Sequence, residues 1–227
     1  MGVSCVVASV GIATTAKAGR PCVADVRHGG YTYAGHQAAN RSRGIRAAIA
    51  LTRAPDVSSG HVAGWVGVGG PGQGATGGDA WIQAGIASLR GLGTVLYAEI
   101  KREGQHSELL LVDESVAVGR QYRIAVREVA ARPGWWRIRV DGTEVAEPIR
   151  MRGTSGRWAP IATAESWNAG ASGCNAFGFR FQGVAVASGP HGSWHPFVSG
   201  HRFLDGRRTL RDVTASADST AFVAASS

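Results

Sequence analysis

The stretch from Gly60 to Ile86 reads GHVAGWVGVGGPGQGATGGDAWIQAGI and contains two short apolar runs around a turn-rich connector. The runs are His61–Val68 and Ala80–Ile86, and the connector between them is mostly glycine. A continuous apolar run bounded by glycine and proline is typical of a buried β-strand rather than a helix. The stretch therefore predicts two strands of a sheet.

The second run has a period of two, so its side chains divide between the faces of the predicted strand. One face carries Ala80, Ile82, Ala84 and Ile86, and the other carries Trp81, Gln83 and Gly85. An amide beside a tryptophan, among small residues, indicates a floor on which a ligand can be held. The alternative is that Gln83 is simply the outward polar residue of a half-buried strand.

The rest of the chain predicts an all-β protein, a two-sheet antiparallel β-sandwich. The 227 residues include 33 glycines and about ten to twelve short apolar or alternating runs, with no long helical periodicity. Asp141-Gly142 between two alternating runs is the strongest hairpin signal, because its two-residue turn needs positive φ. We expect the sandwich to span residues 19–187 and residues 188–227, rich in turns and small residues, to form a C-terminal extension.

The chain is strongly basic, with a formal net charge of +8. Arginine supplies almost all of this charge, and the arginines are scattered along the predicted strands, for example at Arg46, Arg123, Arg127, Arg137 and Arg139. Nucleic-acid binding favours basic residues that cluster and interleave with stacking aromatics. We therefore expect a generally cationic surface and no nucleic-acid partner.

The N-terminus has the pattern of an export signal. Val3–Ala13 is apolar, and Ala16-Lys17-Ala18 forms an A-x-A cleavage pattern, so residues 1–18 are predicted to be a signal peptide and the protein to be secreted. Cleavage would leave Cys22 and Cys174, which could form a disulfide in an oxidising compartment. No apolar run reaches the roughly 18 residues of a membrane-spanning helix, so no membrane partner is expected.

A second chemical candidate lies in the run RWAPIATAESWN, residues 157–168. By alternation, Glu165 shares one strand face with Ile161, Thr163 and Trp167. A carboxylate among small and aromatic residues is a candidate for a raised pKa, because burial disfavours its charged form, and it could then exchange protons near the working pH. The alternative is that Glu165 faces solvent or pairs with an arginine.

The order of four short motifs resembles that of the glutamic endopeptidases, the eqolisins. These motifs are Trp-Val-Gly-Val at Trp65–Val68, Ile-Gln-Ala-Gly at Ile82–Gly85, Tyr-Ala-Glu at Tyr97–Glu99 and Ala-Glu-Ser-Trp at Ala164–Trp167. The resemblance covers roughly Tyr31–Val186. It implies a β-sandwich of two curved antiparallel sheets, like concanavalin A-type lectins and glucanases, with the catalytic pair on the concave face.

The resemblance implies that Gln83 and Glu165 are the catalytic residues of a secreted peptidase. Glu165 would act as general base toward a water that attacks the scissile carbonyl, and Gln83 would orient that water and donate to the oxyanion. We assign Trp65, Trp81, Glu99 and Trp167 to binding of a peptide or protein substrate. The implied chemistry uses no cofactor, and the chain has no zinc motif such as H-E-x-x-H.

Two departures from the family pattern stand beside the resemblance. The family has an acid directly after W-V-G-I, where this chain has Gly69, and its tryptophan- and tyrosine-rich segment is reduced to Leu96–Ile100. Both features help to shape the cleft, so a non-catalytic module that binds carbohydrate or protein on the same scaffold is the alternative function.

Two other enzyme classes have weaker support. Glu99 and Glu165 could serve as the facing carboxylates of a glycosidase. The late histidines His191, His195 and His201 lack a recurring ligand spacing and are expected to be surface residues, and no G-x-S-x-G elbow supports a serine hydrolase.

Overall fold

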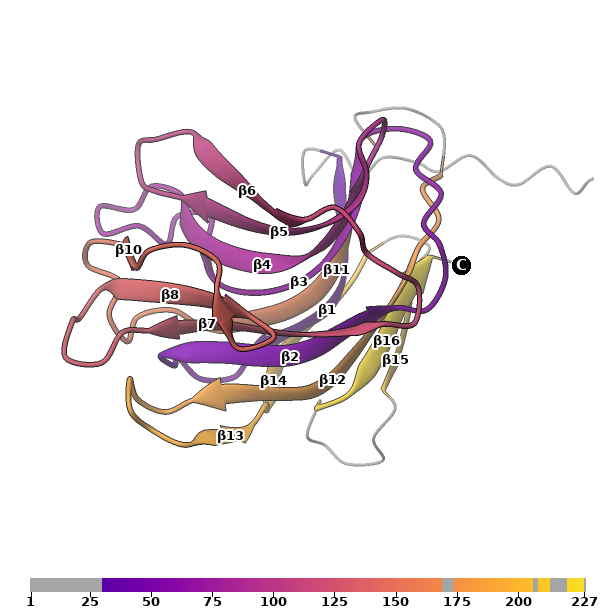
Figure 1. Ribbon diagram of the computed structural model, residues 1–227. Coiled ribbons are helices and arrows are strands. Elements are labelled where there is room, and N and C mark those ends of the chain that lie inside the picture. Colours follow the sequence, from indigo (N-terminus) through magenta and orange to yellow (C-terminus); the bar gives the residue numbers. More distant parts are fainter. Residues whose placement is uncertain (1–29, 169–173, 206–207, 213–219, 227) are drawn as a thin grey trace, which may run out of the picture.

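The computed structural model describes residues 30–168, 174–205, 208–212 and 220–226 of the chain. These residues form sixteen β-strands and no helix, arranged as two antiparallel sheets (Figure 1). The all-β sandwich predicted from the sequence is therefore confirmed. No helix in this part of the chain is long and apolar enough to cross a membrane. The predicted signal peptide, residues 1–18, and Cys22 lie outside the described residues.

The first sheet, called sheet A, has the strand order β14-β1-β11-β3-β4-β5-β6. Its strands are β1 (Tyr31–Ala38), β3 (His61–Gly70), β4 (Ala80–Leu89), β5 (Gly93–Lys101), β6 (Ser107–Asp113), β11 (Pro160–Trp167) and β14 (Ser199–Leu204). The late strand β11 lies between the two early strands β1 and β3 and pairs with both.

The second sheet, sheet B, has the order β10-β8-β7-β2-β12-β16-β15, with β9 beside β8 and β13 beside β12. Its strands are β2 (Gly44–Leu51), β7 (Gln121–Glu128), β8 (Trp135–Val140), β9 (Thr143–Glu144), β10 (Ile149–Arg150), β12 (Gly178–Ala187), β13 (Trp194–Pro196), β15 (Arg208–Asp212) and β16 (Phe222–Ser226). The turn between β8 and β9 is Asp141-Gly142, with φ of +49° and +89° as the hairpin signal requires.

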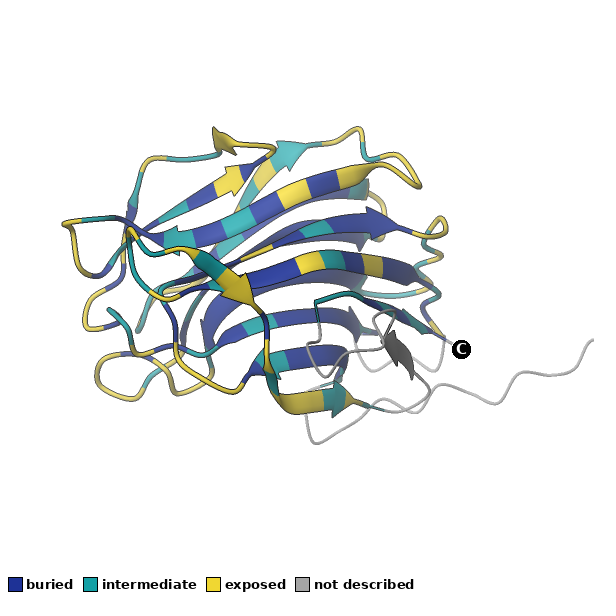
Figure 2. Cartoon of the chain, turned by 90° about the horizontal axis from the view of Figure 1, so that it is seen from below, coloured by how far each residue is buried: buried dark blue, intermediate teal, exposed yellow. Residues whose placement is uncertain are grey.

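The core lies between the two sheets and is built by the alternation read from the sequence (Figure 2). In β4 the buried core side chains are Ile82, Ala84 and Ile86, and in β2 they are Ile45, Ala47, Ile49 and Leu51. Burying one set of alternate side chains in each strand directs the other set to the outer face of its sheet. The outer face of sheet A therefore receives Gln83 and Glu165.

The described part of residues 188–227 differs from the expected extension. It supplies β13, β14, β15 and β16, which pair with strands of both sheets. Phe197 and Phe222 are fully buried in the main core, and Phe222 stacks on Phe181 with ring centroids 4.4 Å apart. The apolar residues dispersed among the turns of this segment thus complete the sandwich rather than cover its surface.

Candidate active site

A cleft of about 580 Å³ lies on the outer face of sheet A. Most of its floor and walls come from the neighbouring strands β1, β11, β3, β4 and β5, of which β11 is far in sequence from the strands beside it. Both predicted catalytic residues, Gln83 on β4 and Glu165 on β11, line it, and each is only 7% exposed. The strand order thus brings the Gln83 amide and the Glu165 carboxyl group into the same cleft.

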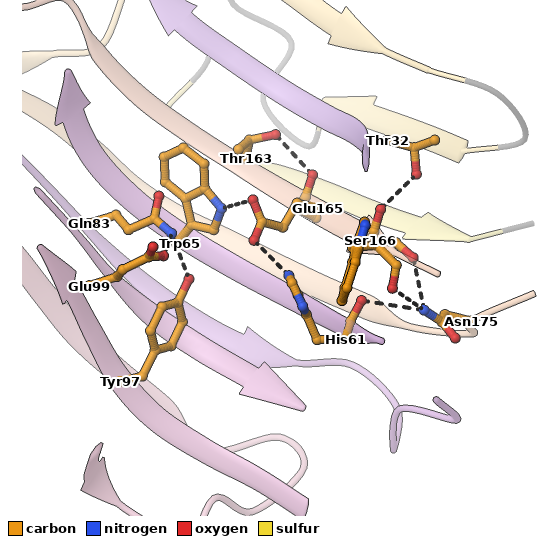
Figure 3. A network of polar contacts seen from close by, with 12 residues as sticks. Thr32, His61, Trp65, Gln83, Tyr97, Glu99, Thr163, Glu165, Ser166 and Asn175 are labelled. Carbon is orange, nitrogen blue, oxygen red and sulfur yellow. Dashed lines mark hydrogen bonds and ion pairs between the residues drawn. The ribbon is translucent and has the colours of Figure 1, made fainter. Parts of the chain in front are cut away.

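Trp65 stands between the two predicted catalytic residues (Figure 3). Glu165 faces Ala63 across the β11–β3 pair, two residues before Trp65. Gln83 lies two residues before Gly85, which faces Trp65 across the β3–β4 pair. Trp65 is therefore a diagonal neighbour of both Glu165 and Gln83, and its indole forms the floor that separates them.

Glu165 makes one polar side-chain contact through each of its carboxyl oxygens (Figure 3). Trp65 Nε1–H donates to Oε2 at 2.9 Å, and His61 Nε2 lies 3.3 Å from Oε1. Both partners come from β3, since His61 and Trp65 are four residues apart and point to the same face. These two contacts fix the position of the Glu165 side chain in the cleft.

The amide of Gln83 is turned toward β5. Its Nε2 donates to Glu99 Oε2 at 2.9 Å and to Tyr97 Oη at 3.3 Å. Glu99 is the residue directly opposite Gln83 in the β4–β5 pair. The two amide hydrogens are thus occupied within the protein, and Oε1 is the amide atom left for the cleft (Figure 3).

Glu99 has a pKa raised above its ordinary value of 4.5. Burial is the main cause, and the negative charge of Glu165 raises this pKa further. Ser107, Trp81 and His61 oppose the rise. The indole N–H of Trp81 is buried without a hydrogen-bond acceptor among the described residues, so it lowers the pKa of Glu99 from nearby rather than through a formed bond.

Aromatic rings form one wall of the cleft beside Glu165. Tyr31 stacks on Tyr33 and on Trp167, with ring centroids 6.2 and 5.9 Å apart, and His61 packs against Trp167 at 5.7 Å. Burial raises the pKa of Tyr31 and Tyr33, and the charge of Glu165 raises both further. The phenols therefore stay protonated and can donate hydrogen bonds to a ligand.

Asn175 forms hydrogen bonds to several chain segments at the end of the cleft that carries these aromatic rings. Its Nδ2 donates to Ser59 O, His61 O, Ser166 Oγ and Trp167 O at 2.8–3.3 Å, and its Oδ1 accepts from Ser58 and Ser59. The side chain is 1% exposed. A single amide thus links the start of β3 to the end of β11, and with them the positions of His61 and Trp167.

Two glycines shape the floor and rim. Gly85 lies on the cleft face, and a Cβ there would come within 2.7 Å of the Trp65 Cβ. Glycine at this position therefore leaves room for the Trp65 side chain on the cleft floor. Gly69, at the rim, has a φ of +90°, and a Cβ would meet the carbonyl oxygen of Ala80 at 2.3 Å. The acid that the family pattern has at this position cannot fit the backbone found here.

The structure gathers most of the residues assigned from the sequence. Gln83, Glu165, Trp65, Trp81 and Glu99 line the cleft. Trp167 does not line it directly but backs its aromatic wall. The sequence reasoning missed His61, Tyr31, Tyr33 and Asn175. His61 could have been found from its period-two relation to Trp65, whereas the position of Asn175 is set by long-range contacts with no local pattern.

Comparisons with known proteins agree with this architecture. No protein-family model matches the chain, and no curated protein sequence matches it. Solved structures do. A structure of scytalidoglutamic peptidase with a peptide-based transition-state analogue superposes with a TM-score of 0.56 at 13% identity and covers 86% of this chain and 98% of the peptidase. The protein has the fold of the glutamic peptidases.

A second solved structure gives the same result. SCP-B, described as a member of the eqolisin family of peptidases in complex with the tripeptide Ala-Ile-His, superposes with a TM-score of 0.52 at 12% identity. It covers 86% of this chain and 98% of its own. The resemblance read from four short motifs is therefore confirmed at the level of the fold. Identity this low shows the fold alone, so the reaction remains a separate question.

Proposed function

We propose that the protein is a glutamic-type endopeptidase that hydrolyses peptide bonds in the cleft of sheet A. The observation that carries the proposal is the placement of Gln83 and Glu165 in one cleft, on either side of Trp65, in a fold shared with glutamic peptidases. The cleft is long enough to cross five strands, which suits an extended polypeptide rather than a small metabolite.

In the proposed reaction Glu165 is the general base. Its ionised carboxylate, held by Trp65 and His61, takes a proton from a water that attacks the scissile carbonyl. The carbonyl oxygen becomes an oxyanion, and the C–N bond breaks as Glu165 returns the proton to the leaving amine. A positioned general base of this kind contributes about 10²–10⁴-fold to a rate.

Gln83 is the proposed oxyanion donor, and this role requires its amide to turn. With Glu99 ionised, Nε2 donates to Glu99 and Tyr97 and only Oε1 faces the cleft. When Glu99 carries a proton, its O–H and that of Tyr97 can both donate to Oε1 of a reversed amide. Nε2–H then faces the cleft, where it can donate to the developing oxyanion.

Glu99 is thus proposed to set the orientation of Gln83. Because burial raises the pKa of Glu99, the protonated form persists to higher pH than that of an ordinary glutamate. The site is expected to be most active in acid and to lose activity as Glu99 ionises. Glu99 acts here through Gln83 and is a positioning residue.

The test is cleavage of an unfolded protein substrate by the purified protein between pH 3 and 8. Glu165→Gln is expected to reduce kcat/KM by about 10²–10⁴-fold and Gln83→Ala by about 10²–10³-fold. Glu147→Gln and Gln121→Ala, exposed changes away from the cleft, are the matched controls and should retain activity. Absence of cleavage by the folded wild-type protein at every pH would reject the proposal.

A non-catalytic binding module is the second candidate, favoured by the stacked rings of Tyr31, Tyr33 and Trp167. Aromatic faces of this kind suit carbohydrate stacking. Binding of an oligosaccharide on a glycan array, lost in Tyr31→Ala, together with no proteolysis would support this function instead. A glycosidase is less well supported, because Glu99, one of its two required carboxylates, is already engaged by Gln83.

We also propose that the protein is secreted. The N-terminal export pattern is the sequence evidence, and the disulfide bond of Cys174 is consistent with an oxidising compartment. Cys22, the partner expected from the sequence, lies outside the described residues. Mass spectrometry of protein recovered from the culture medium, with and without reduction, would give both the mature N-terminus and the disulfide partner.

A further inference from the structure

The five arginines that look dispersed in the sequence meet on the outer face of sheet B, on the opposite side of the sandwich from the cleft. Arg46 lies on β2, Arg123 and Arg127 on β7, and Arg137 and Arg139 on β8, and these strands are adjacent (Figure 1). All five line one pocket of about 400 Å³. The positive charge expected to be spread over the surface is therefore concentrated in part around this pocket.

The strand register explains why the pocket is hollow. Ala125 on β7 faces Arg46 on one side and Arg139 on the other. Arg123 and Arg127 precede and follow it by two residues on the same face of β7. Neighbouring strands lie about 4.8 Å apart, and alternate residues about 7 Å apart. The small side chain of Ala125 thus has an arginine at each of its four neighbouring positions on this face, and these residues line the same pocket.

The protein itself leaves this cluster poorly compensated. Arg127 and Arg137 face each other directly across the β7–β8 pair, which is an unfavourable arrangement for like charges. Two carboxylates lie nearby: Glu144 accepts from Arg137 and Arg139 at 2.8 Å, and Asp141 accepts the backbone N–H of Arg123. The Nε–H groups of Arg127 and Arg137 are buried without an acceptor among the described residues.

Contacts of two kinds hold Arg46 and Arg127 in place without neutralising their charge. The Arg127 Nη2 atom donates to the carbonyl oxygens of Gly189 and Gly192 at 3.2 and 2.5 Å. The guanidinium carbons of Arg46 and Arg127 lie 4.7 and 4.9 Å from the ring centroid of Trp194. Burial lowers the pKa of Arg127, and the charges of Arg46, Arg139 and Arg137 lower it further, as expected for an excess of positive charge.

We propose that this pocket binds a small ligand through a doubly charged tetrahedral oxyanion, a phosphate or sulfate group. Guanidinium forks match the oxygens of such a group, and all five arginines line the same pocket as Ala125. A nucleic-acid strand is less favoured, because Trp194 is the one aromatic ring lining the described pocket and two arginines already pack against it. The site is independent of the proposed peptidase activity.

The test measures binding of inorganic phosphate and inorganic sulfate by calorimetry, and the melting temperature in each salt against chloride at equal ionic strength. Saturable binding and a higher melting temperature are expected for the wild type. Arg46→Gln and Arg123→Gln are both exposed changes and should each weaken binding about tenfold or more. Arg90→Gln removes the same charge from the exposed turn that follows β4, beside sheet A, and should leave binding unchanged.

Both pocket variants should remain folded in chloride, since each removes one charge from a cluster of like charges. A phosphorylated monosaccharide that binds more tightly than inorganic phosphate would support a site for a phosphorylated small molecule, and equal affinity would support a site for the free anion. Equal melting-temperature increments in the wild type and both variants would overturn the proposal. So would binding of single-stranded DNA that inorganic phosphate does not compete away.

Discussion

Gln83 Nε2 donates a 2.9 Å hydrogen bond to Glu99 Oε2, its direct cross-strand neighbour. This contact couples a residue without titratable groups to one whose pKa is raised by burial. In the proposed mechanism the orientation of the Gln83 amide thereby depends on pH, although glutamine itself does not gain or lose a proton.

Glu99→Gln keeps an acceptor for Gln83 and removes the charge. The raised pKa of Glu99 means that the folded state binds this proton more tightly than the unfolded chain does, so wild-type stability falls as pH rises above about 4.5 toward the pKa in the folded state. The variant should therefore be more stable than the wild type at pH 7 and equal to it at pH 3, as measured by thermal unfolding.

The activity profile offers a second measurement of the same change. The decline of kcat with rising pH that is due to Glu99 should disappear in Glu99→Gln, whereas Glu147→Gln should keep the wild-type profile. An unchanged profile in Glu99→Gln would show that Glu99 does not orient Gln83.

Trp65→Phe removes the N–H that donates to Glu165 and keeps a ring on the cleft floor. A hydrogen bond to a charged group is worth about 1.5–3 kcal/mol, so we expect a loss of that order in unfolding free energy and a fall in kcat of about tenfold or more. Trp135→Phe, on the other sheet and with no hydrogen bond to its indole among the described residues, is the control. Equal effects in the two variants would show that ring size matters and the hydrogen bond does not.

Gly69→Asp restores the acid of the family pattern on a backbone that excludes it. The positive φ alone costs about 1–3 kcal/mol, and the 2.3 Å approach of a Cβ to Ala80 O adds to it. Gly77 has a similar φ of +94° with open space around it, so Gly77→Asp isolates the effect of φ. In urea unfolding, Gly69→Asp should be the less stable of the two, and a smaller loss than that of Gly77→Asp would contradict the clash.

Asn175→Ala removes the amide that joins the start of β3 to the end of β11. Its buried partners lose their donor, and we expect a loss of about 2–3 kcal/mol in unfolding free energy. Asn175→Asp keeps the shape but places an oxygen against four oxygens, so it should be at least as unstable. A raised KM in variants that remain folded would show that the aromatic wall has moved.

The strand faces that carry Gln83 and Glu165 could be predicted from the sequence. Alternation placed Gln83 opposite Ile82 and Ile86, and Glu165 opposite Ala162 and Ala164, and the structure agrees. Alternation is a local property that follows from the pleat of a strand, so it can be predicted without knowing which strands are neighbours in the sheet. The ordered motifs supplied the rest of the fold prediction.

Strand neighbours could not be predicted in the same way. The five arginines look dispersed along the chain because the pairing between β2, β7 and β8 is not visible in the sequence. Residues 188–227 resemble an extension because their apolar runs are short and interrupted by glycine and proline, yet pairing holds the described strands of this segment in the sheets. The positions of His61 relative to Glu165 and of Glu99 relative to Gln83 also depend on strand order.

The insertion of β11 between β1 and β3 also has a consequence for biosynthesis. The nascent chain contains Gln83, Glu99 and Trp65 before the ribosome has added Glu165, so the proposed general base is absent while the first strands of sheet A are made. Until then β1 and β3 expose unpaired edges, and such edges favour association with other chains. The order of synthesis thus leaves the proposed active site incomplete until most of the chain has been made, and β1 and β3 stay open to association during that interval.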